Sequence, residues 1–422
     1  MHKILIKNIQ QLAQVREPDC SFIKGNDMST VTSLYDAWLA IENDLIVGYG
    51  AMEDWPGISD WSNLEIIDAD GKIVLPTYCD SHTHIVFAGS REGEFVDRIN
   101  GLSYQEIALR GGGIINSAKK MHSATEEELY QSALMRINEM ISQGTGSIEI
   151  KSGYGLSLDA EIKMLRVIKK LKETLPIPIK ATFLGAHAIP PAYKENRQSY
   201  IDLIINEMLP AIAQEKLADY CDVFCERNYF TPEETISILN AAQKYNLQAK
   251  VHAEQLSNSG GVLAGIKAGA VSVDHLEYVG DTEIEALLQS NTMPVILPGA
   301  AFFLSLPYPP AKKMIAAGLP LAIASDFNPG SSPSGNMNLM NAIACIQYGL
   351  TPEQTINAST LNGAYAMGIS ENYGSITIGK KANFIITKEI PSLAYMPYAF
   401  GSVLMDQVYI NGKLFNGNMP TL

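Results

Sequence analysis

The stretch QAKVHAEQLSNSGGVLAGIKAGAVSVDH, residues 248–275, decides the fold. It begins and ends with short strand-like runs, 248–253 and 270–275, that have the length of buried strands. The segment between them is long enough for a helix. Strand, helix and strand in this order predict a βα unit and therefore a parallel sheet. Both strands end on side chains that can do chemistry, namely His252 and the pair Asp274-His275.

The same alternation continues along the centre of the chain. Helical periodicity is clear in 126–142 and 159–174, and Thr-Pro-Glu sequences at 231 and 351 have the N-cap, proline and acidic first turn of helix starts. Eight strands with intervening helices predict an α/β fold, a TIM-type (β/α)₈ barrel. The predicted strands are 73–76, 146–151, 178–185, 219–225, 248–253, 270–275, 293–298 and 320–325.

The two ends of the chain have a different, β-rich pattern. Residues 64–74 predict a strand pair with a turn at Asp70-Gly71, and Asn411-Gly412 predicts a second hairpin turn within 407–414. We therefore expect a small β-sandwich domain built from residues 1–72 and 371–422. In the sequence, these two segments flank a barrel of residues 73–370. Further strands of this domain are predicted at 2–9, 45–50, 374–380 and 382–387.

Composition excludes several classes of protein. The chain has 422 residues, a net charge of −14, 46% hydrophobic and 18% charged residues, which is typical of a globular protein and not of a disordered one. The net negative charge does not favour binding to nucleic acid or to an anionic membrane. An anionic ligand would need a local cationic site. The sequence is compatible with a homodimer but contains no signal for one.

Cysteine usage and the first residues indicate the compartment. The five cysteines are scattered and odd in number, which favours reduced thiols and the cytoplasm. The first 15 residues lack the apolar core and cleavage site of a secretory signal. The longest apolar run, 295–306, is too short to span a bilayer and is interrupted by Pro298-Gly299.

Histidines gather at the ends of the predicted barrel strands, where such barrels place their active sites. His82 and His84 are two residues apart on an extended segment, so both rings point the same way and can reach one metal ion. Together with His252 and Asp326 they form a three-nitrogen, one-oxygen set that suits zinc or iron and leaves room for a water. His275 is predicted to orient that water or polarise a substrate carbonyl, and Asp326 to accept a proton.

These residues resemble the amidohydrolase superfamily of metal-dependent hydrolases, across nearly the whole chain. Closer motifs are similar to those of one family within it, the imidazolonepropionases. Six sequence blocks carry this resemblance: SHTH (81–84), FAGSR (87–91), GGGI (111–114), EIKSGYGL (149–156), FLGAH (183–187) and DFNPGS (326–331).

The resemblance implies hydrolysis of the ring C–N bond of 4-imidazolone-5-propanoate by a metal-activated water. It implies His82, His84, His252 and Asp326 as ligands of one zinc or iron ion. It further implies that a small anionic substrate is contacted by Arg91, Tyr104, Tyr154, His187, Gln255, Asn328, Gly330 and Ser331. From the residues themselves, Arg91 can pair with a carboxylate in two-point fashion, and the turn 328–331 can offer N–H groups and hydroxyls to it.

One departure from the pattern of the superfamily keeps alternatives open. Related deaminases carry a glutamate three residues after the strand-five histidine, whereas this chain has Gln255, which cannot titrate. The proton-transfer step would then fall to His275, Asp326 or Glu254. The alternative functions are another cyclic-amide hydrolase or an aminohydrolase of the same superfamily, and, against the complete ligand set, a non-catalytic scaffold.

Overall fold

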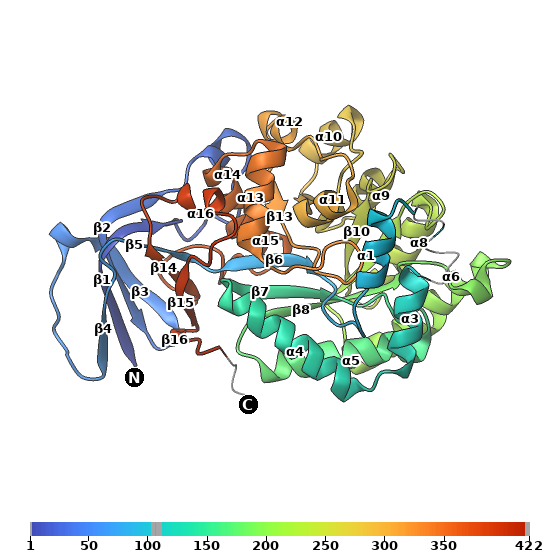
Figure 1. Ribbon diagram of the computed structural model, residues 1–422, viewed down its shortest axis with the longest axis horizontal. Coiled ribbons are helices and arrows are strands. Elements are labelled where there is room, and N and C mark those ends of the chain that lie inside the picture. Colours follow the sequence, from blue (N-terminus) through green and yellow to red (C-terminus); the bar gives the residue numbers. More distant parts are fainter. Residues whose placement is uncertain (1, 103–105, 107–111, 418–422) are drawn as a thin grey trace.

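The computed structural model describes residues 2–102, 106 and 112–417, and these form a barrel with a β domain at one end (Figure 1). The barrel strands are parallel and neighbour each other in chain order. A parallel bridge between Thr83 and Phe327 brings the segment after the last strand back to the first. The strands are β6 (Tyr78–Thr83), β7 (Thr145–Lys151), β8 (Ile179–Ala186), β9 (Tyr220–Cys225), β10 (Gln248–Ala253), β11 (Ser272–His275), β12 (Met293–Ile296) and β13 (Ala322–Ile323).

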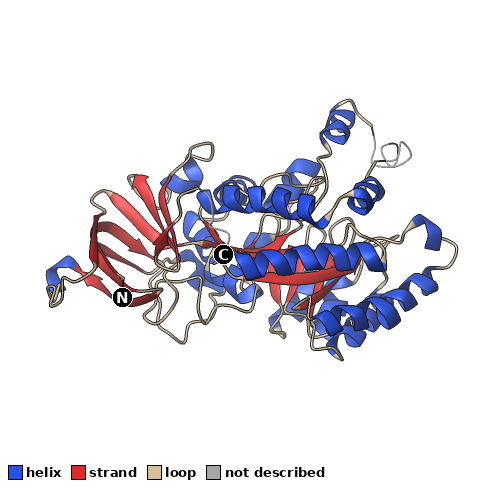
Figure 2. Cartoon of the chain, turned by 90° about the horizontal axis from the view of Figure 1, so that it is seen from below, coloured by secondary structure: helices blue, strands red, loops and turns tan. Residues whose placement is uncertain are grey.

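Helices surround this barrel (Figure 2), and their starts follow the sequence signals. Thr125, Thr231 and Thr351 each cap a helix through a capping box. The larger helices are α1 (Glu92–Ile99), α3 (Ile114–Ser123), α4 (Glu126–Ser142), α5 (Leu158–Thr174), α8 (Pro232–Gln243), α10 (Asp281–Leu288), α13 (Met337–Tyr348) and α14 (Pro352–Ser359). Shorter ones are α6 (Arg197–Leu203), α7 (Leu209–Glu215), α9 (Gly261–Lys267), α11 (Pro298–Leu304), α12 (Ala311–Ala316), α15 (Leu361–Ala366) and α16 (Tyr395–Tyr398). Among the described residues, no helix is both long and apolar enough to cross a membrane.

The β domain predicted from both ends of the chain is confirmed. Its strands form one mixed sheet in the order β16-β15-β14-β5-β1-β2-β3, and β4 also pairs with β1. Side chains such as Ile6, Leu39 and Phe384 give this sheet a hydrophobic core of its own. The strands are β1 (Lys3–Ala13), β2 (Ser33–Glu42), β3 (Leu45–Ala51), β4 (Leu64–Asp68), β5 (Lys72–Pro76), β14 (Phe384–Glu389), β15 (Met405–Ile410) and β16 (Lys413–Leu414).

The prediction of 73–76 as the first barrel strand was wrong. These residues lie in β5, which pairs with β1 and β14 of the β domain, so the sheet places the domain boundary after Pro76 and not at residue 72. The first barrel strand is β6, whose sequence YCDSHT is fully buried. It lacks the apolar run expected of a buried strand, and Asp80, His82 and Thr83 instead form hydrogen bonds inside the barrel.

Two smaller predictions in the β domain were also wrong. The segment 64–74 contains two strands and a turn at Asp70-Gly71, but β4 and β5 do not form a hairpin. Both run parallel to β1, β4 along residues 3–7 and β5 along residues 11–12. The stretch 374–380 is not a strand, because only Ile376 pairs, in an isolated bridge to Val15. The hairpin at Asn411-Gly412 is confirmed.

Candidate metal centre and adjoining cavity

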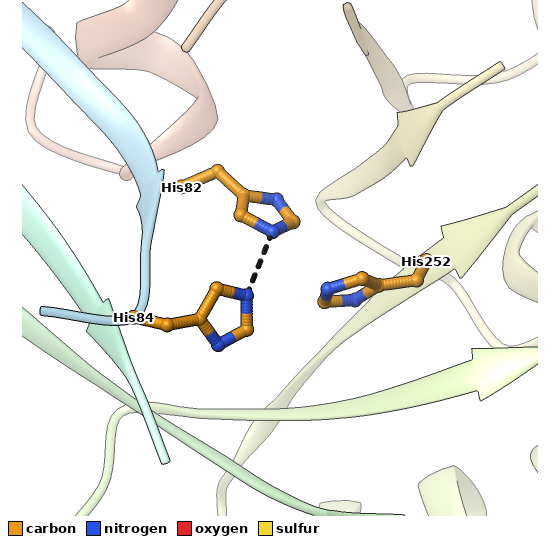
Figure 3. A group of neighbouring side chains, drawn as sticks. All are labelled: His82, His84 and His252. Carbon is orange, nitrogen blue, oxygen red and sulfur yellow. Dashed lines mark hydrogen bonds between the residues drawn. The ribbon is translucent and has the colours of Figure 1, made fainter. Parts of the chain in front are cut away.

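Three histidine side chains from two barrel strands converge at the carboxyl ends of those strands (Figure 3). His82 and His84 come from the end of β6, and His252 comes from β10. One ring nitrogen from each lies within 4.8 Å of the others, and all three side chains are buried. The Nε2 atoms of His82 and His84 are 3.2 Å apart. The i, i+2 spacing therefore places both rings on one side of the strand, as the sequence predicts.

Asp326 is brought to the same point by the closure of the barrel. The Asp326 N–H donates to the carbonyl of His82 at 2.9 Å, and the His84 N–H donates to the carbonyl of Phe327 at 2.9 Å. One Asp326 oxygen, Oδ1, consequently lies 3.5 Å from Nε2 of both His82 and His84. The carboxylate of Asp80 supports this segment by accepting hydrogen bonds from the backbone and hydroxyl of Ser325.

The donor set fits a single transition-metal ion. Nδ1 of His82 lies 2.6 Å from Asp274 Oδ2, and because a carboxylate only accepts, Nδ1 carries the proton and Nε2 is left as a ligand. Burial is the largest cause that lowers the pKa of His82 and His84 well below the usual value, and the surrounding cations lower it further. Both rings are therefore neutral and can offer a nitrogen lone pair to a metal ion. Three imidazoles and one carboxylate are typical ligands for zinc or iron.

His275 lies beside this cluster and faces a carboxylate, that of Glu277. Its ring centroid is 5.3 Å from that of His252 and 5.6 Å from that of His82. Nδ1 of His275 is 3.5 Å from Glu277 Oε1. Burial lowers the pKa of His275, but the charge of Glu277 and of Asp326 outweighs it, and the net shift is upward. The backbone φ of +91° at His275 is a conformation that costs energy outside glycine and is typical of functional sites.

Glu254 points away from the cluster. Its carboxylate accepts hydrogen bonds from the Val262 N–H at 3.0 and 3.3 Å, at the start of α9. The expectation that Glu254 could share the proton-transfer step is therefore wrong. A φ of +51° at Glu254 breaks the strand alternation that would otherwise place its side chain on the same face as His252. Gln255, the next residue, lines the cavity instead.

A cavity of about 420 Å³ adjoins the metal cluster. His187, one of its lining residues, stacks on His84 with ring centroids 5.6 Å apart, and Ser331 donates to Asp326 Oδ2 at 3.1 Å. The structure thus brings seven of the eight predicted substrate contacts to one cavity. Tyr104, the eighth, lies outside the described residues, as does Gly111 of the glycine-rich block. The seven are Arg91, Tyr154, His187, Gln255, Asn328, Gly330 and Ser331.

Two arginines supply positive charge to this cavity. Arg91 directs Nε and Nη2 to Glu94 Oε2, at 2.9 and 2.5 Å, and its Nη1 lies against Gly330. Arg98, two helical turns further along α1, donates to the carbonyl of Gly330 at 3.3 Å. Sequence reasoning missed Arg98, although the seven-residue spacing places it on the same face as Arg91. Glu94 also accepts the Gly113 N–H at 3.0 Å, which ties α1 to the glycine-rich loop.

The turn 328–331 does not offer its backbone in the way the sequence suggests. The N–H groups of Gly330 and Ser331 both donate to Asn328 Oδ1 at 2.8 Å. The Asn328 amide nitrogen donates to the carbonyl of Asp326 at 2.6 Å and to the Ser331 hydroxyl at 2.7 Å. The expectation of N–H groups presented to a carboxylate is corrected accordingly: this turn braces Asp326.

Tyr154 and His187 are fixed by a buried carboxylate and a backbone carbonyl. Glu161 of α5 accepts the N–H groups of Gly153, Gly155 and Leu156 at 2.7–3.0 Å, which orders the loop that carries Tyr154. His187 Nδ1 lies 3.1 Å from the Gly153 carbonyl and therefore donates to it. Burial lowers the pKa of His187 to about 3, so the ring enters the cavity neutral.

The chain is similar to known proteins over most of its length. Residues 73–415 match the model of the Amidohydrolase family. An imidazolonepropionase of Flavobacterium johnsoniae is 58% identical over 410 residues, 97% of this chain and 99% of the relative. That of Christiangramia forsetii is 56% identical over 97% and 99% of the two chains, and that of Alkaliphilus oremlandii 42% identical over 97% of each.

Solved structures share the fold at much lower identity. A triazine hydrolase variant has a TM-score of 0.72 at 16% identity and covers 99% of this chain and 96% of its own. An adenosine deaminase of Xanthomonas campestris, solved with bound zinc, has a TM-score of 0.69 at 17% identity and covers 98% and 92%. The barrel with its terminal β domain is therefore a shared architecture of these hydrolases.

Proposed function

Because the chain belongs to the amidohydrolase family and, within it, to the imidazolonepropionases, we propose that its cavity binds 4-imidazolone-5-propanoate. The reaction is a hydrolysis in histidine degradation that yields N-formimidoyl-L-glutamate. One water is consumed: its oxygen joins the ring carbonyl carbon, the bond from that carbon to the ring nitrogen breaks, and the nitrogen takes a proton.

The observation that carries the proposal is the composition of the cavity. It adjoins a cluster of three histidines and one carboxylate and is lined by Arg91 and Arg98. A planar ring with an anionic tail matches such a cavity, because the two cations outnumber Glu94, the carboxylate that lines the cavity beside them, and so offset the repulsion expected from a net charge of −14. We assign the pair with the propanoate to Arg91, whose Nη1 lies against Gly330 at the cavity wall.

His82, His84, His252 and Asp326 would hold one zinc or iron ion. When bound, that ion supplies a polarised water whose pKa is lowered toward neutrality. Asp326 accepts the proton of this water at a carboxylate oxygen, in an orientation fixed by Ser331 and by the backbone pairing with His82. His275, whose Nδ1 faces Glu277 and whose pKa is raised by that carboxylate, acts as the imidazolium: it donates from Nε2 to the ring carbonyl oxygen and stabilises the charge that develops there.

The neighbouring side chains position the ring. Gln255 cannot exchange protons, so it contributes hydrogen bonds from its amide in place of acid–base chemistry. His187 donates from Nδ1 to Gly153 and keeps Nε2 as an acceptor for a ring N–H. Tyr154, which lies 5.7 Å from His187 between ring centroids, covers one side of the substrate.

The test is metal analysis of the purified protein together with a substrate panel. We expect one equivalent of zinc or iron and turnover of 4-imidazolone-5-propanoate at a kcat/KM far above that of other cyclic amides and of aminopurines. Preference for an aminopurine would favour an aminohydrolase, and preference for another cyclic amide would favour a different ring-opening hydrolase. A metal-free protein without turnover would contradict the proposal altogether.

We further propose that the protein works in a reducing compartment, the cytoplasm. All five cysteines are free, and Cys79, Cys221 and Cys225 are buried. Free, scattered thiols are typical of chains that fold where disulfides do not persist. A homodimer stays a prediction, which measurement of the molar mass in solution would test.

A further inference from the structure

A cluster of buried charges lies inside the barrel next to the metal centre. Lys151 donates to Glu149 Oε1 at 2.7 Å and to Asp222 Oδ2 at 2.8 Å, and lies 3.7 Å from Asp274 Oδ2. Lys250 donates to the other oxygen of Glu149 at 2.5 Å. None of these five side chains is exposed to solvent. The three carboxylates and two ammonium groups come from strands β7, β9, β10 and β11.

Two of these acids each hold one histidine of the metal centre. Asp274 Oδ2 lies 2.6 Å from Nδ1 of His82, and Asp222 Oδ2 lies 3.0 Å from Nδ1 of His252. The second oxygen of each acid is also occupied: Ser272 donates to Asp274 Oδ1 at 2.7 Å, and the His252 N–H donates to Asp222 Oδ1 at 3.1 Å. An acid bonded to the far nitrogen of a metal-binding histidine fixes both its tautomer and its ring orientation.

Lys151 connects the two acids, although the histidines that they hold belong to strands on different sides of the barrel. The same oxygen atoms that face His82 and His252 face the Lys151 ammonium. His84 differs, since no ion pair with an acid is found at its Nδ1 among the described residues, and its pairing with Asp326 is through Nε2. The chain therefore contains two histidines coupled to one lysine and a third that is not.

We propose that Lys151 is a positioning residue, which aligns His82 and His252 for one metal ion by holding Asp274 and Asp222 against their Nδ1 atoms. This inference rests on the metal centre of the proposed function and deepens it. Removal of the ammonium leaves two buried carboxylates that repel each other and lose their common partner. Each acid then shifts, and the two imidazoles lose their shared orientation.

Lys250 provides a matched control. It is as buried as Lys151 and carries the same charge. Its ion pair within the described residues is with Glu149, whereas Lys151 also pairs with Asp222 and Asp274, the acids that face the histidines. Lys151→Met and Lys250→Met each remove one buried ammonium at similar side-chain volume. A general loss of barrel stability would affect both variants, whereas loss of histidine alignment would affect Lys151→Met far more.

The first measurement is the metal dissociation constant of the apo-protein, by competition with a chelator for Zn²⁺. We expect Lys151→Met to bind roughly 10- to 100-fold more weakly than the parent, the usual effect of losing such support, and Lys250→Met to change by less than about threefold. Unchanged affinity in Lys151→Met, or equal losses in both variants, would overturn the inference. A parent protein that binds no metal would instead refute the proposed function.

A second measurement needs no variant and remains informative if Lys151→Met does not fold. Long-range ¹H–¹⁵N spectra of histidine-labelled apo-protein report which ring nitrogen carries the proton. We expect protonated Nδ1 in His82 and His252, with single-histidine substitutions giving the assignment. Protonated Nε2 in either ring would contradict the alignment by Asp274 and Asp222.

Discussion

The anionic tail of the proposed substrate should depend on Arg91, and Arg91→Ala tests this directly. Nε and Nη2 of Arg91 are engaged by Glu94, while Nη1 lies against Gly330 at the cavity wall. The side chain is 12% exposed, so its charge acts with little screening by solvent. Arg98 lines the same cavity and remains in the variant. The substitution therefore removes one of two cations and a two-point donor.

The expected loss of binding free energy follows from the hydrogen bonds that Arg91 can make to the carboxylate. A hydrogen bond to a charged group contributes about 1.5–3 kcal/mol. Since Glu94 already occupies part of the guanidinium and Arg98 retains attraction for the tail, we expect a loss near the lower half of that range, about 2 kcal/mol. This corresponds to a fall of about 30-fold in kcat/KM. The loss should appear mainly as a higher KM, because the tail is bound equally in ground and transition states.

The assay compares 4-imidazolone-5-propanoate with its neutral propanamide analogue. If Arg91 binds the carboxylate, the variant loses about 30-fold on the acid and far less on the amide, so the preference for the acid collapses. Arg98→Ala is the control for a change in overall cavity charge. Equal losses on acid and amide, or unchanged kinetics on both, would refute the assignment of Arg91.

Three further substitutions test the site. His82→Ala should lose metal and turnover together by elemental analysis and assay, since it removes a ligand and the partner of Asp274; full retained activity would exclude this metal centre. Gln255→Glu should keep its metal, because Gln255 lines the cavity and is not one of the clustered donors; a large loss of metal would show that its side chain is misplaced. Glu254→Gln should lower the free energy of unfolding in urea by about 1 kcal/mol, because the carboxylate accepts a hydrogen bond from the Val262 N–H. It should leave kcat within a few-fold, because this carboxylate points away from the histidine cluster. A large fall in kcat would instead show that Glu254 carries a proton in the reaction.

The proposed metal ligands could be located from sequence because strand geometry constrains their positions strongly. Side chains two apart on a strand share a face, and the carboxyl ends of parallel barrel strands meet on one rim. His82, His84 and His252 needed nothing else. Asp326 needed the barrel to close, and closure is itself implied by eight βα units in succession.

The first barrel strand could not be found by the same reasoning. An apolar run marks a strand that is buried among apolar neighbours, which is true of β5 in the β domain. β6 is equally buried, but Asp80, His82 and Thr83 meet hydrogen-bond partners from β7, β11 and the segment after β13. Its burial depends on contacts with residues far away in sequence, and no local pattern encodes them. For the same reason, the sequence did not indicate that Asp222 and Asp274 face the histidines.

Strand alternation fails at the rim, where the chemistry lies. Glu254, His275 and Asp326 each follow or end a strand with positive φ, between +51° and +91°. A single residue in that conformation turns the chain and reverses which side chain faces the cavity, so Gln255 enters it and Glu254 leaves it. Such conformations cost energy for non-glycine residues and persist only where the surrounding bonds impose them. At Asp326 those bonds are the paired backbones of β6 and the closing segment. At Asp326, therefore, the closure of the barrel both imposes the unusual backbone conformation and brings the carboxylate to the histidines.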